Sequence, residues 1–472
     1  MTDTLTLPDT RTALAWAHDA FKRHGGHYGN CRAYLSGEQP LEFATDKFKS
    51  AFGRQFKTFA YNRCAMVVDA HADRLQVEGF GADNDALAQA AQDLWDANQM
   101  DVREGQVEAE AFGMGDGYVI VELHPTTGEV LIWPQYAENV RVQYSDTRPG
   151  EITQAARRWY DPDTKYLHLN LYFPDRIEKY RSVRPVSSGG ESVSWDTMQW
   201  DRYTPDGEAW PVLLTVTDTV PVFHFGNNAR VNHYGVSELR DVIPLQDAIN
   251  KTVMDMLVAM EFAAFPQRVV IGVDTSDDDT IDALARLQTG IDRMVAITGD
   301  GDKQASIAEF SAANMTQYLD VAEKFDQFIA RVSRVPSRYL TQEATAVSGT
   351  SKRMDEAPWV SKIEDRQRAF GAVWADVARY GLRLVGVESE RGALRVNWQP
   401  AAPLSEGEQL EQAEAKERIG WPFPAILREM GYEPEQVDQI VQERDKEREA
   451  SLVADFGAPA GDDEPQEPEE AA

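Results

Sequence analysis

Two long helical segments with apolar stripes lie on either side of a short segment of different composition. Apolar residues recur at helical spacing from Leu245 to Met260, in a run that ends before Pro266, and again from Leu319 to Val332. Between them, "RVVIGV" predicts a strand, which an acidic stretch and a "TGDGDK" turn follow. The two helices therefore enclose a small mixed subdomain, and this order constrains the fold more than any other feature.

The apolar stripes of these two helices cover more than one side of each. One small subunit cannot bury all of that apolar surface by itself. We therefore expect part of it to pack between neighbouring copies of the chain. The residues predicted at this contact are Leu245, Ile249, Val253, Phe325, Phe328 and Ile329.

The rest of the chain combines helices and strands. Helical patterns fill the region up to about residue 111, and residues 117–225 are predicted to be rich in strands. In "YLHLNLYF" the leucines alternate with polar residues, which predicts a strand with one buried and one solvated face. A third long helix is expected from Ser351 to Leu384, bent near Pro358 or Gly371. The acidic end from about Ser451 is expected to be disordered.

A stretch of small and polar residues, "QEATAVSGTSKRMDEA", separates the second striped helix from the third long helix. Pro336 ends the preceding helix, and Ser348 to Ser351 supply turn and N-cap residues. These residues predict a loop from Gln342 to Thr350. From the residues alone it is either a functional loop or a solvated surface linker.

The net charge and the cysteines exclude several classes of protein. With 47 Lys and Arg against 78 Asp and Glu, the chain carries a formal charge of −31, which argues against a broad grip on nucleic acid phosphates. Cys31 and Cys64 have no CxxC partner, so we expect two reduced thiols and neither a zinc site nor a disulfide framework. Neither a signal peptide nor a membrane-spanning run is evident, and we expect a soluble intracellular product.

Motifs for catalysis or nucleotide binding are weak. "GMGDG" at residues 113–117 looks like a nucleotide-binding glycine loop, but that motif follows a strand and opens a helix, whereas here a helix precedes a strand. A P-loop motif is absent. His224, in "VPVFHFG", has no nucleophile or carboxylate beside it, so we interpret it as a structural histidine. Four aspartates can hold a divalent cation, but a solvated acidic turn is favoured: Asp277, Asp278, Asp279 and Asp282.

The order of these segments resembles the portal proteins of tailed bacteriophages, in particular the siphophage branch found in actinobacterial phages. The resemblance runs from about Asp19 to Glu449. It is strongest from Gly235 to Gly272, where "SEL", "LQDAINK" and "FPQR" follow the pattern of that family. The "GWPFPAILREM" stretch departs from the usual entry to the last helices.

The resemblance implies an α+β fold with an α/β wing, two long stem helices, a small mixed α/β clip, a long kinked wing helix and a helical C-terminal crown. It implies a ring, usually of twelve copies, at one vertex of the capsid. The segments it implies are the wing (1–232), the stem helices (233–262 and 311–335), the clip (263–310), a channel loop (336–350), the wing helix with its returning strand (351–400), the crown (401–450) and an acidic tail (451–472).

The resemblance also implies functional residues and partners. It places the loop in a channel, where small side chains pass duplex DNA without reading bases while two basic residues touch phosphates. Those loop residues are Gln342, Ala344, Thr345, Ser348, Gly349, Thr350, Lys352 and Arg353. The clip, with Asp277, Asp278, Asp279 and Asp282, would dock a packaging motor (the terminase large subunit) and head-tail connector proteins.

Further expectations follow from the same resemblance. Capsid or scaffold proteins are expected partners, and the chain is expected in the virion, and in the host cytoplasm during assembly. Neither a cofactor, a metal, a membrane contact nor enzyme activity is expected. Two alternatives stay open at this point, namely a metal-dependent DNA-processing enzyme and a virion scaffold protein that encloses no DNA.

Overall fold

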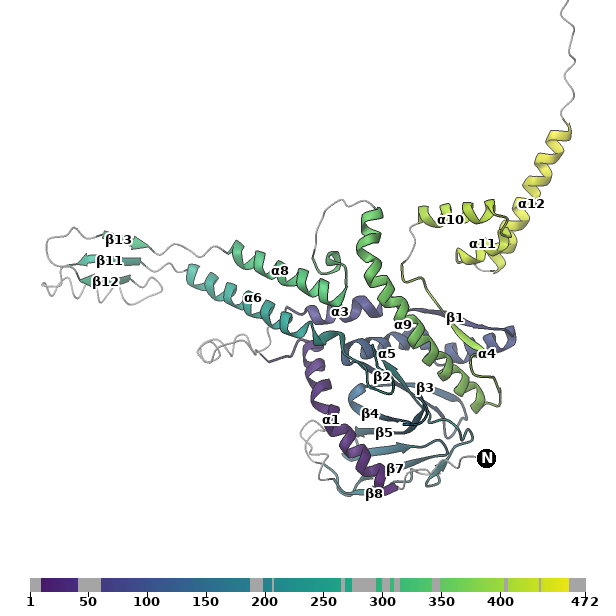
Figure 1. Cartoon of the computed structure of the whole chain (residues 1–472), viewed down its shortest axis with the longest axis horizontal. Coiled ribbons are helices and arrows are strands. Elements are labelled where there is room, and N and C mark those ends of the chain that lie inside the picture. The colour runs from purple at the N-terminus through teal and green to yellow at the C-terminus, as the bar shows by residue number, and fades with distance from the viewer. Residues whose placement is uncertain are drawn as a thin grey trace, which may run out of the picture. The chain divides into compact units, whose positions relative to one another are not determined.

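The computed structural model places the 472-residue chain in two compact units, residues 1–401 and 402–472, which are described separately. The described residues are 10–40, 61–186, 198–205, 208–264, 268–273, 294–298, 306–309, 315–341, 349–402, 406–432 and 434–457. Figure 1 shows the mixture of helices and strands that the sequence predicts.

The core of the first unit is a three-stranded sheet with helices packed on it. The strand order is β10-β2-β3, and both pairs are antiparallel. The helices α5 and α9 pack on this sheet, and α3 and α1 pack on α5. The bounds are α1 Thr10–Ser36, α3 Arg63–Ala72, α4 Asp85–Ala97, α5 Met100–Met114, β2 Asp116–Leu123, β3 Val130–Gln135 and β10 Val222–Gly226.

A six-stranded antiparallel sheet follows, in the order β4-β5-β6-β7-β8, with β9 paired to β7. Its central strand corrects one expectation, because every residue of β6 is buried and neither face is solvated. Ala17 and Phe21 of α1 cover the leucine face, as expected, but on the other face His168 stacks on Trp159 and Tyr172 packs into the main core. The bounds are β4 Val140–Tyr144, β5 Ile152–Tyr160, β6 Leu167–Tyr172, β7 Arg176–Ser182, β8 Trp200–Arg202 and β9 Val212–Leu213.

The two striped helices form as predicted, with strands between them in the chain. A short η4 turn, Glu238–Arg240, leads into α6, Ile243–Ala264, and the second helix is α8, Thr316–Ser333. Between them β11 (Arg268–Val273) pairs parallel with β12 (Met294–Thr298) and antiparallel with β13 (Ser306–Glu309).

The third long helix, α9, runs from Gly349 to Leu384 without interruption at Pro358 or Gly371. It begins two residues before the predicted start at Ser351, so Gly349 and Thr350 belong to the helix and not to the loop. After α9, β14 (Leu394–Trp398) pairs antiparallel with β1 (Val77–Ala82).

The second unit contains α10 (Glu406–Arg418), α11 (Phe423–Glu429) and α12 (Pro434–Gly457). Helix α12 continues past Ser451, where the sequence predicts the start of a disordered tail, so that boundary is wrong by several residues. Among the helices of the described ranges, none is long and apolar enough to cross a membrane.

Candidate functional site

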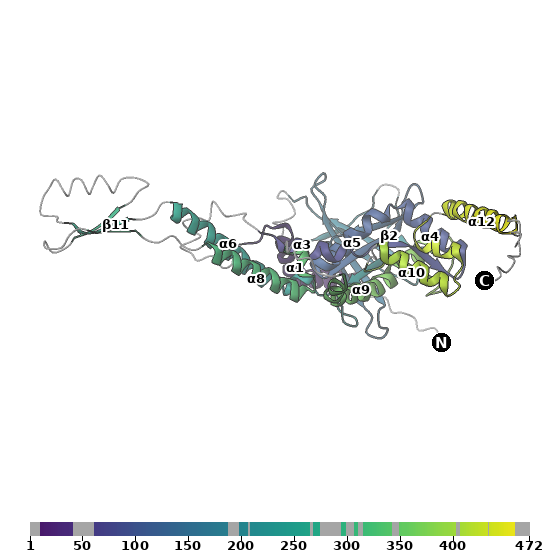
Figure 2. The ribbon, with the colours of Figure 1, turned by 90° about the horizontal axis from the view of Figure 1, so that it is seen from above.

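The helices α6 and α8 lie side by side in both ribbon views (Figures 1 and 2). Each presents one face to the core of its own subunit. On α6 that face includes Ile249, and on α8 it includes Ile329, and neither side chain has any exposed surface. Ala330, one residue further along α8, is also buried in the same core. We call this side of α8 its inner face.

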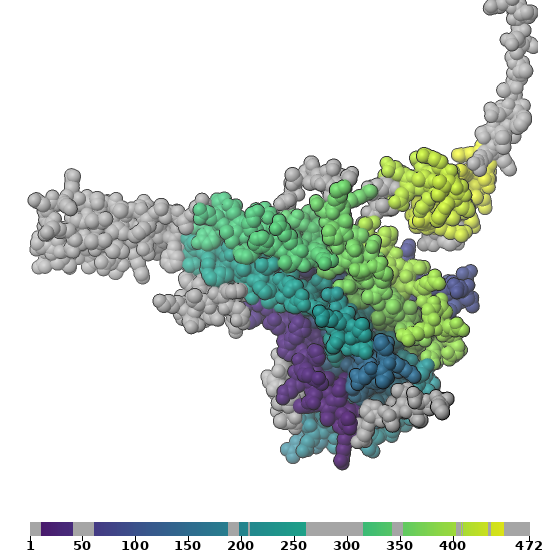
Figure 3. All heavy atoms as spheres, viewed as in Figure 1, coloured from purple at the N-terminus to yellow at the C-terminus, as the bar shows by residue number. Residues whose placement is uncertain are grey.

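A second side of α8, next to the inner face, is apolar but exposed, and we call it the outer face. Val321 is 45% exposed, Phe328 42% and Val332 47%, and the half-buried Phe325 lies between them in the sequence. Residues spaced by four, three and four form one stripe along a helix. In the space-filling view α8 lies at the surface beside α6 (Figure 3). Within the described residues Phe325 packs partly against the core, while Val321, Phe328 and Val332 keep nearly half of their surface exposed.

This division of α8 corrects part of the predicted contact between copies. Ile249 and Ile329 are fully buried in the core of their own subunit, so they belong to the fold and have no surface left for a neighbour. Phe328 is exposed. The remaining three predicted residues, Leu245, Val253 and Phe325, are half-buried and pack partly against that core.

Arg63, the first residue of α3, makes polar contacts with both α6 and α8, and we call this set of contacts the clamp. The guanidinium of Arg63 donates to both carboxylate oxygens of Asp326 on α8, at 2.8 Å each. The backbone N–H of the same residue donates to Oε1 of Gln246 on α6, at 2.7 Å. Asp326 is 6% exposed in its side chain, so this ion pair is largely shielded from water. The two helices are therefore tied to one residue of a third helix.

A second charged cluster joins α9 to the same helix pair. Nζ of Lys362 donates to Glu238, just before α6, at 2.6 Å, and to the carbonyl oxygen of Ser333, the last residue of α8, at 3.0 Å. Glu238 also accepts from Nδ2 of Asn227 at 3.0 Å. One turn after Lys362, Nε of Arg366 donates to Oδ1 of Asn227 at 2.6 Å. The helix that follows the predicted loop is thus anchored to both stem candidates.

Burial and charge set the protonation of this cluster. Burial acts to raise the pKa of Glu238, but Lys362 and His71 outweigh it and hold that pKa below its usual value. Burial lowers the pKa of Lys362, and Glu238 opposes the shift. Burial, and then the charge of Lys362, lower the pKa of His71 to about 4. The carboxyl group of Glu238 is therefore ionised and the histidine neutral near pH 7.

A third polar cluster explains His224 and the glycine-rich stretch. Asp116 accepts hydrogen bonds from Tyr28 at 2.7 Å, from Nε2 of His224 at 2.6 Å and from the backbone N–H of Gly235 at 2.6 Å. Tyr144 hydrogen-bonds to Nδ1 of the histidine at 2.6 Å. The fold thus places a carboxylate beside His224 where the sequence indicated none, and both nitrogens of this buried ring have partners.

The glycines of "GMGDG" allow two chain segments to cross at this cluster. Gly115 takes a φ of +98°, in the region that favours glycine. A Cβ on Gly235 would overlap the carbonyl oxygen of Gly115, so no side chain fits there. The motif that resembles a nucleotide loop is therefore a close backbone crossing between the α5–β2 turn and the segment before η4.

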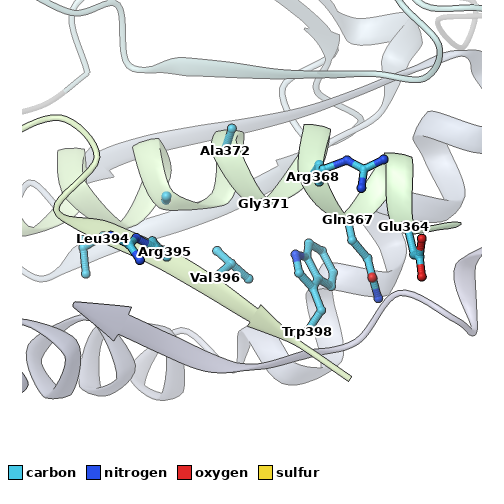
Figure 4. A pocket seen from close by; sticks show the side chains of 10 residues that line it. Glu364, Gln367, Arg368, Gly371, Ala372, Leu394, Arg395, Val396 and Trp398 are labelled. Carbon is cyan, nitrogen blue, oxygen red and sulfur yellow. The ribbon is translucent and has the colours of Figure 1, made fainter. Parts of the chain in front are cut away.

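Helix α9 and β14 border a groove of about 540 Å³ (Figure 4). Gly371 forms part of its wall, and a Cβ there would lie 2.9 Å from Nε1 of Trp398. The glycine thus lets the indole of β14 lie against the helix. Charged residues of α9, including Glu364 and Arg368, line the rest of this wall.

The other predicted site residues are only partly placed by the structure. Within the described ranges no cluster of three potential metal ligands occurs. Cys31 and Cys64 are buried and not paired in a disulfide. Lys352 and Arg353 lie in the first turns of α9. The predicted residues that lie outside the described ranges are Gln342, Ala344, Thr345, Ser348, Asp277, Asp278, Asp279 and Asp282.

The sequence has relatives among phage proteins. The portal protein of Mycobacterium phage L5 is 24% identical over 333 residues, which are 68% of this chain and 64% of that protein. The portal protein of Mycobacterium phage D29 is 26% identical over the same length, with the same shares of the two chains. The alignments therefore cover slightly less than two thirds of the curated relatives. Both phages infect actinobacteria, as the sequence resemblance predicts.

Two solved structures are similar in part. A chain in the virion of a native gene transfer agent particle aligns with a TM-score of 0.40 and 11% identity, over 83% of this chain and 94% of that one. A chain in the neck of an empty gene transfer agent particle aligns with a TM-score of 0.41 and 12% identity, over the same shares. The profile of the family described as phage portal protein, SPP1 Gp6-like, matches residues 60–421, most of the sequence. The chain therefore belongs to the SPP1 Gp6-like family of phage portal proteins.

Proposed function

We propose that this chain is the subunit of a portal ring that forms the channel for DNA at one vertex of a capsid. The observation that carries the proposal is the exposed apolar stripe on the outer face of α8, in a chain of a portal family. Exposed apolar stripes of this kind mark contacts with another protein. A ring of identical copies covers such a stripe in every subunit, because each copy contacts the next.

The segments take their proposed roles from this arrangement. Residues 1–232 form the wing, α6 and α8 the stem, and residues 263–310 the clip. The loop before α9 is the channel loop, residues 351–400 form the wing helix and its strand, and residues 401–450 the crown. The buried clusters around Arg63 and Lys362 support this assignment, because they fix the stem pair and α9 at a common base.

The strongly negative charge of the chain is compatible with a channel through which DNA moves. A surface with a net charge of −31 per copy repels phosphates, so a duplex can slide along it without being held. Contacts to the DNA are then local, weak and independent of base sequence. The twelvefold number of copies is part of this proposal.

The proposed partners follow from the same role. They are double-stranded DNA, the large subunit of a packaging motor, head-tail connector proteins and capsid or scaffold proteins. The acidic clip residues Asp277, Asp278, Asp279 and Asp282 are proposed to meet basic surfaces, so binding of the motor should weaken as salt is added. We place the protein in the virion, and in the host cytoplasm during assembly.

Negative-stain imaging of the purified chain tests the proposal. We expect closed rings with a central hole, formed in the presence of a metal chelator. A monomer with metal-dependent nuclease activity would support the alternative of a DNA-processing enzyme. A closed assembly without a central hole would support the alternative of a scaffold protein.

A further inference from the structure

The charge of the chain inverts around the end of α8 and the start of α9. Residues 331–353 contain five basic residues and one acidic residue, in a chain whose net charge is −31. The basic residues are Arg331, Arg334, Arg338, Lys352 and Arg353. Only the last two belong to the predicted set of channel-loop residues. Arg331 and Arg334 precede the predicted channel loop, Arg338 lies near its start, and the structure describes all three.

Arg334 stands at the point where α8 ends. It takes a φ of +65° and a ψ of 11°, in the left-handed region that few residues other than glycine occupy. Its side chain is exposed, and so is that of Arg331 one turn earlier. Among the described residues neither arginine has a carboxylate within ion-pair distance, whereas Arg338 is paired with Glu356.

Helix α9 brings two more cations close to this point, because Nζ of Lys362 donates to the carbonyl oxygen of Ser333, the residue before Arg334, at 3.0 Å, and Arg366 follows one turn later. Arg366 is half-buried and donates to the amide oxygen of Asn227, a neutral partner. Lys362 is buried, and its carboxylate partner is Glu238. The other nearby acid, Asp365, is already paired with Arg368. Arg334 and Arg366 therefore share a corner of the molecule with too few carboxylates to balance them.

The electrostatics of the corner agree with this imbalance. Burial lowers the pKa of Arg366, and the positive charge of Arg334 adds to the shift against the opposing effects of Glu238 and Asp365. The same arginine and Arg366 add to the lowering of the pKa of Lys362 by burial. Cations that repel one another in a partly desolvated site are stabilised by a bound anion.

A simpler explanation accounts for only half of the cluster. Basic residues near the C-terminal end of a helix are favoured by the helix dipole, which suffices for Arg331 and Arg334. It does not explain Arg366, which α9 contributes from well inside its length. The convergence of cations from two helices points to a ligand outside the subunit.

We propose that Arg334 and Arg366 form a phosphate-binding site for the backbone of duplex DNA. This inference rests on the proposed portal function, which places the loop after α8 in the channel. The guanidinium groups offer paired N–H donors that match a phosphate. One such site per subunit, in an otherwise acidic wall, gives repeated weak contacts without base recognition.

The test measures binding of a short fluorescent DNA duplex to purified rings over a series of salt concentrations. The variant is Arg334→Glu, and Arg334→Lys keeps the charge. The matched control is Arg395→Glu, which makes the same charge change at an exposed arginine of β14 that has no ion pair within the described residues. Sedimentation of each protein reports whether the ring is intact.

We expect Arg334→Glu rings to stay closed and to bind the duplex about tenfold less tightly at low salt. The slope of log K against log salt should become shallower by about 0.9 for each phosphate that the variant no longer neutralises. Arg334→Lys should retain most of the binding, and Arg395→Glu should match the wild type.

Three outcomes would overturn the inference while leaving the portal proposal intact. Equal losses in Arg334→Glu and Arg395→Glu would mean general repulsion. Disassembly of the Arg334→Glu ring would mean that the site binds a carboxylate of a neighbouring copy. Wild-type rings that bind no duplex at low salt would mean that the site has no DNA ligand. A wild-type chain that forms no ring would instead refute the portal proposal itself.

Discussion

The two faces of α8 are built from different kinds of contact. The inner face carries Asp326, Ile329 and Ser333, all buried: Asp326 is paired with Arg63, the carbonyl of Ser333 accepts from Lys362, and Ile329 lies in the apolar core. The outer face carries Val321, Phe328 and other apolar residues that stay exposed. Within the part of the chain that the structure describes, the inner face is buried against the same chain, whereas the outer face stays largely exposed.

This difference separates residues that stabilise the subunit from residues that serve assembly. A buried ion pair adds little stability by itself, but it fixes the geometry of the groups it joins, and losing one partner is costly. An exposed apolar stripe contributes little to the subunit and gains free energy only when another surface covers it. Changes on the inner face should therefore affect folding, and changes on the outer face the proposed ring.

The largest effect is expected at the clamp on the inner face. Replacing Arg63 by methionine leaves Asp326 buried without its cation. The free energy of unfolding should fall by about 3–5 kcal/mol, measured by urea denaturation of the subunit. The double variant Arg63→Met with Asp326→Leu should recover most of this loss, since neither charge then remains. No recovery in the double variant would show that the clamp acts through packing and not through charge.

A smaller, pH-dependent effect is expected from His71, which lies beside Lys362. Its pKa is about 4 in the folded chain against 6.5 in its usual state. Between these pH values the imidazole is therefore protonated in the unfolded chain and neutral in the folded chain. The free energy of unfolding is therefore highest above pH 6.5, and it falls as the pH is lowered toward 4, because protonation of His71 then favours the unfolded chain.

The substitution His71→Phe removes this titration. Between these pH values the stability of the variant should depend on pH less steeply than that of the wild type, by up to about 1.4 kcal/mol per pH unit. Urea denaturation at a series of pH values measures both slopes. Parallel slopes for the two proteins would mean that the histidine is already charged in the folded state.

The smallest effect on stability is expected on the outer face. Val332→Ser should change the free energy of unfolding by only about 0.5 kcal/mol, because the side chain is already half in water. The matched substitution on the inner face, Ile329→Ala, should cost about 2–4 kcal/mol, since it opens a cavity in the core. Similar losses of unfolding free energy at the two positions would contradict the distinction between a buried inner face and an exposed outer face.

The sequence predicts much of the fold, but not which apolar residues lie inside. Helical periodicity locates α6, α8 and α9 to within a few residues of their observed bounds. It cannot separate Phe328 from Ile329, because adjacent apolar residues both extend a stripe and only the packed partner decides which is buried. That partner is chosen by the tertiary fold, as the full burial of Ile329 shows.

The candidate site was less predictable still. Arg63 and Asp326 are separated by 263 residues in the sequence, and nothing in either local pattern indicates their pairing. The same holds for Glu238 and Lys362, which meet only because the fold brings η4 and α9 within hydrogen-bonding distance. The sequence does show Gly115 in the glycine-rich stretch "GMGDG", but that stretch looks like a nucleotide-binding loop. Only the fold shows that it crosses the segment that contains Gly235.

Assembly of the Phe328→Asp chain tests the central claim most directly. The substitution places a charge in the middle of the outer face and touches none of the buried partners of the inner face. Analytical ultracentrifugation should give a folded monomer for this variant, with the far-UV circular dichroism of the wild type, while the wild type sediments as a closed ring. A closed Phe328→Asp ring of normal size would contradict the claim that the outer face of α8 joins neighbouring subunits.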